Sequence, residues 1–87
     1  MPATLNRMVV DALKSRDIPI IELSKALCEV RGIGEVEMQV MEVDANTETV
    51  KIVFKGDDVD YDAAVETMRQ YGTVIRSIDE ISMSKSG

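Results

Sequence analysis

The residues with the clearest potential for chemistry are a run of aspartates in the second half of the chain. Asp58, Asp60 and Asp62 alternate along the sequence, a spacing that lets carboxylates converge on one hard cation such as calcium. The rest of a calcium-binding loop is missing, because Ala63 stands where that loop needs glycine and Arg69 where it needs glutamate. Asp60 is also placed to cap a helix. The run therefore predicts either a weak calcium site or, more simply, the start of a helix.

A second polar group combines residues from the two ends of the chain. Arg7 and Asp11 share one face of an N-terminal strand, beside which the last strand of the expected fold should lie. That last strand adds four polar residues, namely Arg76, Ser77, Asp79 and Glu80. Together these side chains can bind a small ligand or an ion, or form a salt-bridge network between subunits. The network is the simpler explanation.

The composition excludes several kinds of chemistry. The chain has no histidine, which removes the commonest general base, the histidine-activated nucleophiles and every histidine-containing metal site. The one cysteine, Cys28, cannot form an internal disulfide or a paired-thiol site. A carboxylate pair with one pKa raised by burial is the remaining acid–base option. We expect a protein that is not an enzyme.

Charge and hydropathy limit the partners. The net charge of −6 and an aromatic content of 3% oppose binding to nucleic acid, which favours basic and aromatic surfaces. No apolar run approaches the ~20 residues of a membrane span, and the first residues lack the apolar segment of a secretory signal. We expect a cytoplasmic protein without nucleic-acid or membrane partners.

Hydrophobic periodicity predicts alternating strands and helices. Alternation with period two indicates four strands, at residues 5–13, 36–43, 50–55 and 74–81. Apolar residues at helical spacing, with Asp or Pro before them and Gly after them, indicate helices at about 20–30 and 60–71.

The resulting order, βαββαβ, is that of an α+β ferredoxin-like plait. Right-handed crossovers place both helices on one face of a four-stranded antiparallel sheet. We expect a single domain over residues 1–87, with an ordered core at about 5–81 and a loose tail at 82–87.

Several apolar side chains are predicted to point away from the helices. They are Val9, Leu13, Met41, Val43 and Val53. An uncovered apolar sheet face needs a cover, and edge strands carry unpaired backbone groups. We therefore expect a homo-oligomer formed through the open sheet face and the edge strands, with a regulatory role and a small ligand or ion bound near subunit interfaces. A calcium-binding protein is the alternative, and an enzyme using two carboxylates is a second one.

Three stretches of the chain carry a family resemblance. They are Thr47-Glu48-Thr49-Val50-Lys51, Asp60-Tyr61-Asp62 and, most specifically, Val74-Ile75 followed by Ser77-Ile78-Asp79-Glu80. Together they resemble the small, mostly archaeal domain-of-unknown-function family numbered 211. The resemblance implies a ferredoxin-like homo-oligomer with no established activity.

The chain departs from that family's pattern at two positions. Thr73 stands where the pattern has a second glycine, and Arg76 where it has a histidine. Any ligand or base role of that histidine is lost here, and an arginine makes the neighbourhood better suited to an anion.

Overall fold

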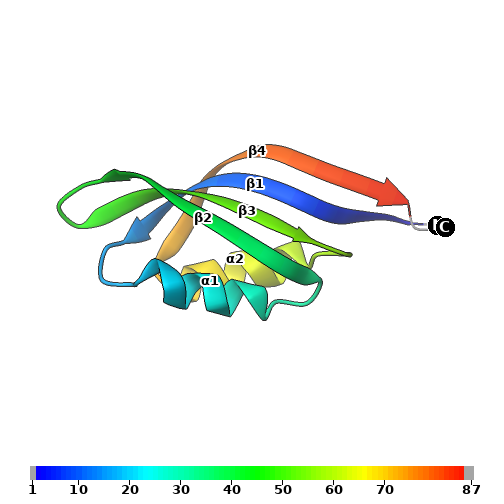
Figure 1. Ribbon diagram of the computed structural model, residues 1–87, viewed down its shortest axis with the longest axis horizontal. Helices are drawn as coiled ribbons and strands as arrows, with labels where there is room; N and C mark the ends of the chain where they lie inside the picture. The colour runs from blue at the N-terminus through cyan, green and yellow to red at the C-terminus, as the bar shows by residue number, and fades with distance from the viewer. Residues whose placement is uncertain (1, 86–87) are drawn as a thin grey trace.

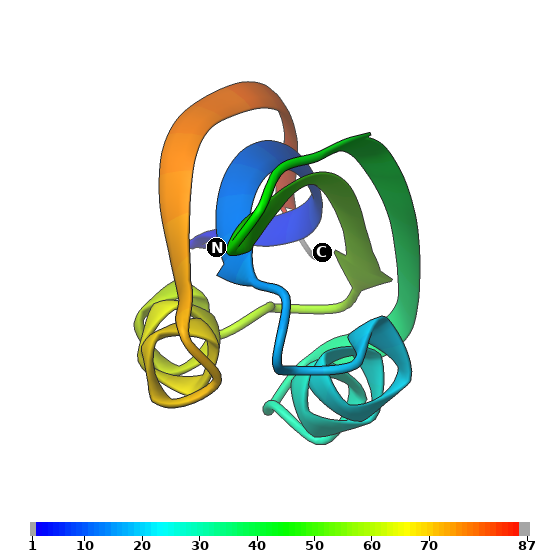
Figure 2. The same ribbon diagram turned by 90° about the vertical axis from the view of Figure 1, so that its left-hand side faces the viewer.

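The computed structural model describes residues 2–85 and contains six elements of secondary structure. In chain order they are β1 (Ala3–Ser15), α1 (Ile20–Cys28), β2 (Ile33–Val43), β3 (Thr47–Gly56), α2 (Tyr61–Gln70) and β4 (Thr73–Lys85). The strands form one antiparallel sheet in the order β2-β3-β1-β4. Both helices lie on the same side of this sheet (Figure 1), which arches over them when viewed along the strands (Figure 2). The predicted ferredoxin-like α+β plait is confirmed.

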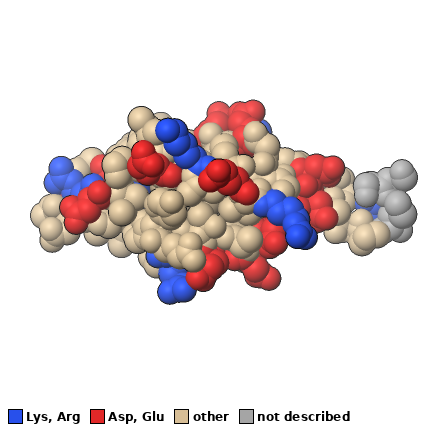
Figure 3. Space-filling model, turned by 90° about the horizontal axis from the view of Figure 1, so that it is seen from below, with Lys and Arg blue, Asp and Glu red and all other residues tan. Residues whose placement is uncertain are grey.

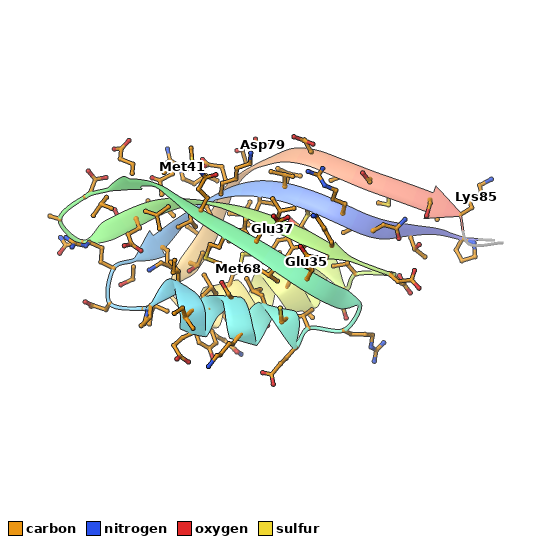
Figure 4. All side chains as sticks on the ribbon, viewed as in Figure 1. Glu35, Glu37, Met41, Met68, Asp79 and Lys85 are labelled. Atoms are coloured by element: carbon orange, nitrogen blue, oxygen red, sulfur yellow. The ribbon has the colours of Figure 1, made fainter. Side chains whose placement is uncertain are left out.

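The hydrophobic core fills the space between the sheet and the helices. Alternate residues of the two central strands point into it, namely Met8, Val10 and Ala12 from β1 and Val50, Ile52 and Phe54 from β3. The helices add Leu23, Leu27, Ala64 and Met68, and Figure 4 shows Met68 between α2 and the sheet. Burying each large apolar side chain of this kind stabilises the fold by about 1.5–3 kcal/mol.

Two turns pack backbone against backbone at one end of the helices. Gly32, which follows α1, has a left-handed φ of +88°, and a Cβ atom there would overlap the carbonyl oxygen of Asp58. A Cβ atom on Gly56 would in turn overlap the carbonyl oxygen of Gly32. The Asp57 N–H donates to that Gly32 oxygen at 2.8 Å. The glycines thus let the β3–α2 turn lie directly on the α1–β2 turn, which positions the start of α2.

The outer strand β4 is longer than the sequence analysis predicts. The loose tail expected from residue 82 is wrong for residues 82–85, because β4 continues to Lys85, and residues 86–87 lie outside the described part. The extension is held by the backbone ladder with β1, in which Ala3 pairs with Lys85 and Leu5 with Met83. As a result β1 and β4 run together beyond the end of the helix layer (Figure 1).

The register between β1 and β4 contains two bulges on β4. Ile75, Ile78 and Ile81 stand opposite Ala12, Val10 and Met8, respectively. The register shifts between these pairs leave Arg76 and Asp79 as extra residues on β4. Each extra residue turns the strand's usual spacing of two into a spacing of three. The three isoleucines therefore all lie on the helix side of the sheet.

Within the described residues, neither helix is long and apolar enough to cross a membrane. They contain 9 and 10 residues, whereas a span needs about 20.

Candidate functional site

The face of the sheet away from the helices carries charged side chains from all four strands. Between β1 and β4, Arg7 Nη1 lies 2.9 Å from Glu80 Oε1. Between β3 and β2, Lys55 Nζ lies 2.8 Å from Glu37 Oε2 and 3.7 Å from Glu35 Oε2. Arg7 and Lys55 are direct partners in the β1–β3 ladder. We call Arg7, Lys55, Glu35, Glu37 and Glu80 the open-face network.

The ion pairs of the network shift the pKa values of Glu37, Lys55 and Glu80 in the directions that favour their charged forms. The hydrogen bond from Arg7 holds the pKa of Glu80 below its ordinary value, and the Arg7 charge adds to the effect. The hydrogen bond from Lys55 likewise lowers the pKa of Glu37, while the hydrogen bond to Glu37 and the nearby Glu35 carboxylate raise the pKa of Lys55.

The apolar side chains predicted for this face are only partly exposed. Val9 is 1% exposed, and Leu13 and Val53 are half-buried. In the ladder Val9 stands between Val53 and Glu80, where the long charged side chains around it can cover it with their aliphatic stems. Met41, at the far end of β2, is more than half exposed. The open-face position predicted for Val43 is wrong, because Val43 stands opposite Glu48, which pairs with Lys14 on the helix side.

Most of the ligand-binding residues predicted from the sequence do lie together. Besides the Arg7–Glu80 pair, Ser77 Oγ donates a hydrogen bond of 2.9 Å to Asp79 Oδ1. Asp11 is the ladder partner of Ser77. Figure 4 shows Asp79 on the side of the sheet away from the helices. Arg76 is exposed and forms no ion pair with the rest of residues 2–85.

A hollow on the same face contains residues that the sequence analysis missed. Its volume is about 380 Å³, and its lining includes Arg7, Glu37, Gln39 and Lys51. The hollow offers both cationic and anionic groups to a small molecule. Alternation along the strands could have placed these residues on this face, because successive side chains of a strand point to opposite faces. Glu37 and Gln39 alternate with apolar residues of β2, and Lys51 stands between two apolar residues of β3.

The three aspartates proposed as calcium ligands lie at the start of α2. Asp60 caps α2, because its Oδ1 accepts a hydrogen bond of 3.0 Å from the Ala63 N–H. Asp58 and Asp62 line the same small hollow, but Arg31 lines it too and opposes a cation. Within residues 2–85, no three acidic or cysteine side chains converge as a metal-binding group. Calcium binding by this segment stays a prediction without structural support.

A buried lysine is the main polar feature that the sequence analysis did not predict. Lys14, near the end of β1, is 1% exposed, and its Nζ lies 2.7 Å from Glu48 Oε1. The same Nζ donates to the carbonyl oxygens of Ser15 and Ile18. The ammonium thus ties the β1–α1 turn to the first residues of β3.

The helix side of the molecule has a shallow groove of about 690 Å³ along α1. Ile21, 64% exposed, and the exposed Cys28 both line it. Seen from this side, acidic and basic side chains surround a largely uncharged surface (Figure 3).

The largest set of exposed apolar residues lies on β4. Ile78, Ile81 and Met83 are 48%, 55% and 57% exposed, and all three face the helix side of the sheet, opposite Val10, Met8 and Leu5 of β1. Together with Leu5 and Tyr61 they line a hollow of about 440 Å³. We call Ile78, Ile81 and Met83 the β4 apolar row.

These features define a ferredoxin-like plait with a charged open face and an uncovered edge strand. The chain belongs to the DUF211 family, described as "Uncharacterized ArCR, COG1888", whose model matches residues 6–86. It is 33% identical over 81 residues to the uncharacterised protein MJ0319 of Methanocaldococcus jannaschii, an alignment covering 93% of this chain and 84% of that protein. The family resemblance noted in the sequence is confirmed.

Proposed function

We propose that this protein is a non-catalytic domain that assembles with copies of itself through its β4 edge. In this proposal the polar residues shared by β1 and β4 bind a small ligand or an ion at or near the boundary between subunits, and assembly is the regulated property.

The β4 apolar row is the observation that carries the proposal. Contiguous exposed apolar surface is uncommon on a monomeric protein and indicates an interaction site. Here the row lies on an edge strand, whose outer backbone N–H and C=O groups have no partner strand within residues 2–85. A second protein surface on this edge would cover the apolar side chains and pair the backbone at the same time.

The charge states on the open face favour binding over catalysis. A general acid or base works best when its pKa lies near the working pH. The pKa values of Glu37 and Glu80 are instead lowered, and that of Lys55 is raised. These shifts favour the charged forms of the three groups, as in ion pairing and in binding of charged ligands.

The position of the polar cluster connects ligand binding to assembly. Ser77, Asp79 and Glu80 belong to β4 itself, and Arg7 reaches Glu80 from the neighbouring strand. Any partner on the β4 edge would therefore lie next to these groups.

The test is the mass of the protein in solution. Light scattering after size exclusion, and sedimentation equilibrium from 1 to 200 µM, should give a mass that is a multiple of 9.6 kDa. A strictly monomeric mass over this range contradicts the proposal. In parallel, thermal melts with glycine, acetate and inorganic phosphate test the ligand part, and a midpoint unchanged by all three would contradict binding of small charged ligands.

A further inference from the structure

The hollow on the open face of the sheet contains charged groups of both signs that the ion pairs of the network leave partly unused. Its lining includes Arg7, Glu37, Gln39, Lys51 and Val53, and we call it the open-face hollow. We infer that it binds a free α-amino acid, with the ligand carboxylate between Arg7 and Lys51 and the ligand ammonium on Glu37. This inference rests on the ligand-binding part of the proposed function, because it names the ligand class, and it does not depend on assembly.

Val53 lies between the charged residues of the open-face hollow. In the ladders it stands opposite Glu37 of β2 and Val9 of β1. Val53 is half-buried and Val9 is 1% exposed, so this part of the floor is apolar. Lys51 lies two residues from Val53 along β3 and therefore points to the same face.

Arg7 reaches the open-face hollow from the side of Val53 opposite to Glu37. It is the ladder partner of Lys55, and so a diagonal neighbour of Val53. The hydrogen bond and charge of Lys55 lower the pKa of Glu37 most, and the charge of Arg7 lowers that pKa further. The guanidinium of Arg7 is therefore near enough to Glu37 for one small molecule to contact both.

The two cationic groups of the hollow have donors available for a ligand. Arg7 uses Nη1 for Glu80 at 2.9 Å, and a guanidinium has several further N–H donors. Lys51 is exposed and forms no ion pair with the rest of residues 2–85, although Asp11 is its ladder partner in β1. These free donors can hold a carboxylate.

The anionic group of the hollow is also only partly used. Glu37 contacts Lys55 through Oε2 at 2.8 Å, and its Oε1 has no ion-pair partner within residues 2–85. That oxygen can accept a hydrogen bond from an ammonium group. Gln39, the ladder partner of Lys51, adds an amide that can donate or accept a hydrogen bond.

The balance of charge in the lining favours a zwitterion over a simple anion. Arg7 and Lys51 are positive, whereas Glu37 is negative. A phosphate ion would satisfy the two cations but would be repelled by Glu37. An α-amino acid carries its ammonium and its carboxylate on one carbon atom, so it can form charge-assisted hydrogen bonds with all three groups.

Ion pairs hold two of the three charged groups in place without a ligand. Arg7 is fixed by Glu80, and Glu37 is fixed by Lys55. Ordering long side chains is part of the free-energy cost of binding, and here that cost falls mainly on Lys51. The volume of about 380 Å³ is at the small end of the range for small-molecule sites.

The chemical shifts of valine methyl groups test the location of the ligand. Protein with ¹³C-labelled valine methyl groups is titrated with glycine to millimolar concentrations at low salt. The Val53 methyl resonances should shift and saturate, whereas those of Val74, an exposed residue of β4, should not move. Acetate and methylammonium each carry only one of the two charges, so each should bind about tenfold more weakly than glycine.

Two substitutions test the roles of the charged groups. Lys51→Met and Glu37→Gln should each weaken glycine binding about tenfold, because each removes one hydrogen bond between charged groups. Lys25→Met and Glu22→Gln make the same changes in charge at exposed positions of α1, and they should leave glycine binding unchanged. Far-UV circular dichroism checks the folding of all four variants.

Inorganic phosphate distinguishes a zwitterion site from an anion site. Glu37→Gln removes a negative charge, so it should weaken the binding of glycine and strengthen any binding of phosphate. An equal or higher affinity of Glu37→Gln for glycine would identify the hollow as an anion site and would overturn the inference.

The other outcomes separate this inference from the proposed function. No glycine-dependent shift at Val53 overturns the inference. Shifts confined to the amides of Ser77 and Asp79 would locate the ligand in the polar cluster of β1 and β4, which overturns the inference and leaves the proposed function standing. A monomeric mass together with a saturating shift at Val53 would reject assembly and support the inference.

Discussion

At the scale of single residues, the most costly group to bury in this fold is the ammonium of Lys14. A buried charge is tolerated only when it is paired and hydrogen-bonded. Lys14 meets both conditions through Glu48 and two backbone carbonyls. The sequence analysis could not identify this group, because a lysine in an alternating strand is usually exposed.

Replacing this lysine tests its role in stability. Lys14→Met leaves Glu48 without its partner and two carbonyl groups without a donor, so we expect the free energy of unfolding to fall by about 3 kcal/mol. Urea unfolding followed by circular dichroism measures the loss. Lys25→Met, an exposed change on α1, serves as the control, and equal effects of the two substitutions would contradict the structural role of Lys14.

The Arg7–Glu80 pair predicts a dependence on acid. Because the folded-state pKa of Glu80 is lowered from 4.5, the pair stabilises the protein above that pH and loses its effect as the pH falls through the lowered pKa. Arg7→Gln should move the pKa of Glu80 back up, which an NMR titration of the Glu80 side chain detects. Arg16→Gln, just after the C-terminal end of β1, should leave the pKa of Glu80 unchanged. A Glu80 pKa unaffected by Arg7→Gln would show that the pair does not form in solution.

The Asp60 cap leads to a prediction that separates folding from ion binding. Asp60→Ala removes the acceptor for the Ala63 N–H and should lower the free energy of unfolding by about 1 kcal/mol, with or without calcium. We expect millimolar calcium, compared with EDTA, to leave the melting midpoint of the wild type unchanged. A rise of several degrees that Asp60→Ala abolishes would instead establish the calcium site.

At the scale of elements, the order and type of every strand and helix could be predicted, but not the extent or facing of β4. Apolar alternation identifies the central strands well, since their side chains enter the core. The spacing of Ile75, Ile78 and Ile81 is three, which is not the period of a regular strand. The three isoleucines share one face because of the two bulges, whose positions depend on the fit to β1 and do not follow from alternation along β4 alone. Alternation did not predict that β4 extends over residues 82–85, because this mostly polar stretch is held by backbone pairing with β1.

In the candidate site, too, the sequence predicts which strands are neighbours but not the contacts that depend on their exact fit. The joining of Arg7 to Glu80, and of Ser77 to Asp79, could be foreseen from the expected adjacency of the first and last strands. The burial of Val9 could not be foreseen, because it depends on residues of the neighbouring strands that are distant in the sequence. Aspartates at alternating positions look alike whether they cap a helix or bind an ion.

The contact between the two turns gives a prediction at this scale. Gly32→Ala would place a side chain in a left-handed conformation, which costs about 1–2 kcal/mol, and against the backbone of Asp58. We expect a larger total loss of stability, measured by thermal and urea unfolding. Gly34→Ala is the matched control, since its Cβ would lie 3.8 Å from the nearest heavy atom and its φ is not left-handed. Similar losses for both would mean that the turns do not pack closely.

At the scale of the whole molecule, the paired outer parts of β1 and β4 make the protein elongated. Its extents are 47 × 22 × 17 Å, and the long dimension follows these two strands beyond the helices (Figure 1). On the helix side of these strands Leu5 is buried, whereas Ile81 and Met83 of β4 remain more than half exposed.

The proposed self-assembly would make the thermal stability of the protein depend on its concentration. A partner that binds only the folded state raises the free energy of unfolding by mass action, so the melting midpoint should rise between 2 and 200 µM protein. Differential scanning calorimetry measures it, with Ile78→Asp as the variant expected to show no rise. A midpoint independent of concentration in the wild type would argue against assembly over this range.

The ladder between Ala3 and Lys85 also has a consequence for how the chain acquires its fold during synthesis. The strand made first has the strand made last as one of its two neighbours, and contacts between residues far apart in sequence form slowly. Until β4 emerges from the ribosome, one edge of β1 stays unpaired while the rest of the sheet can already form. We therefore expect nascent chains that stop before residue 73 to aggregate, and release of β4 to be the step that makes the protein resistant to proteolysis.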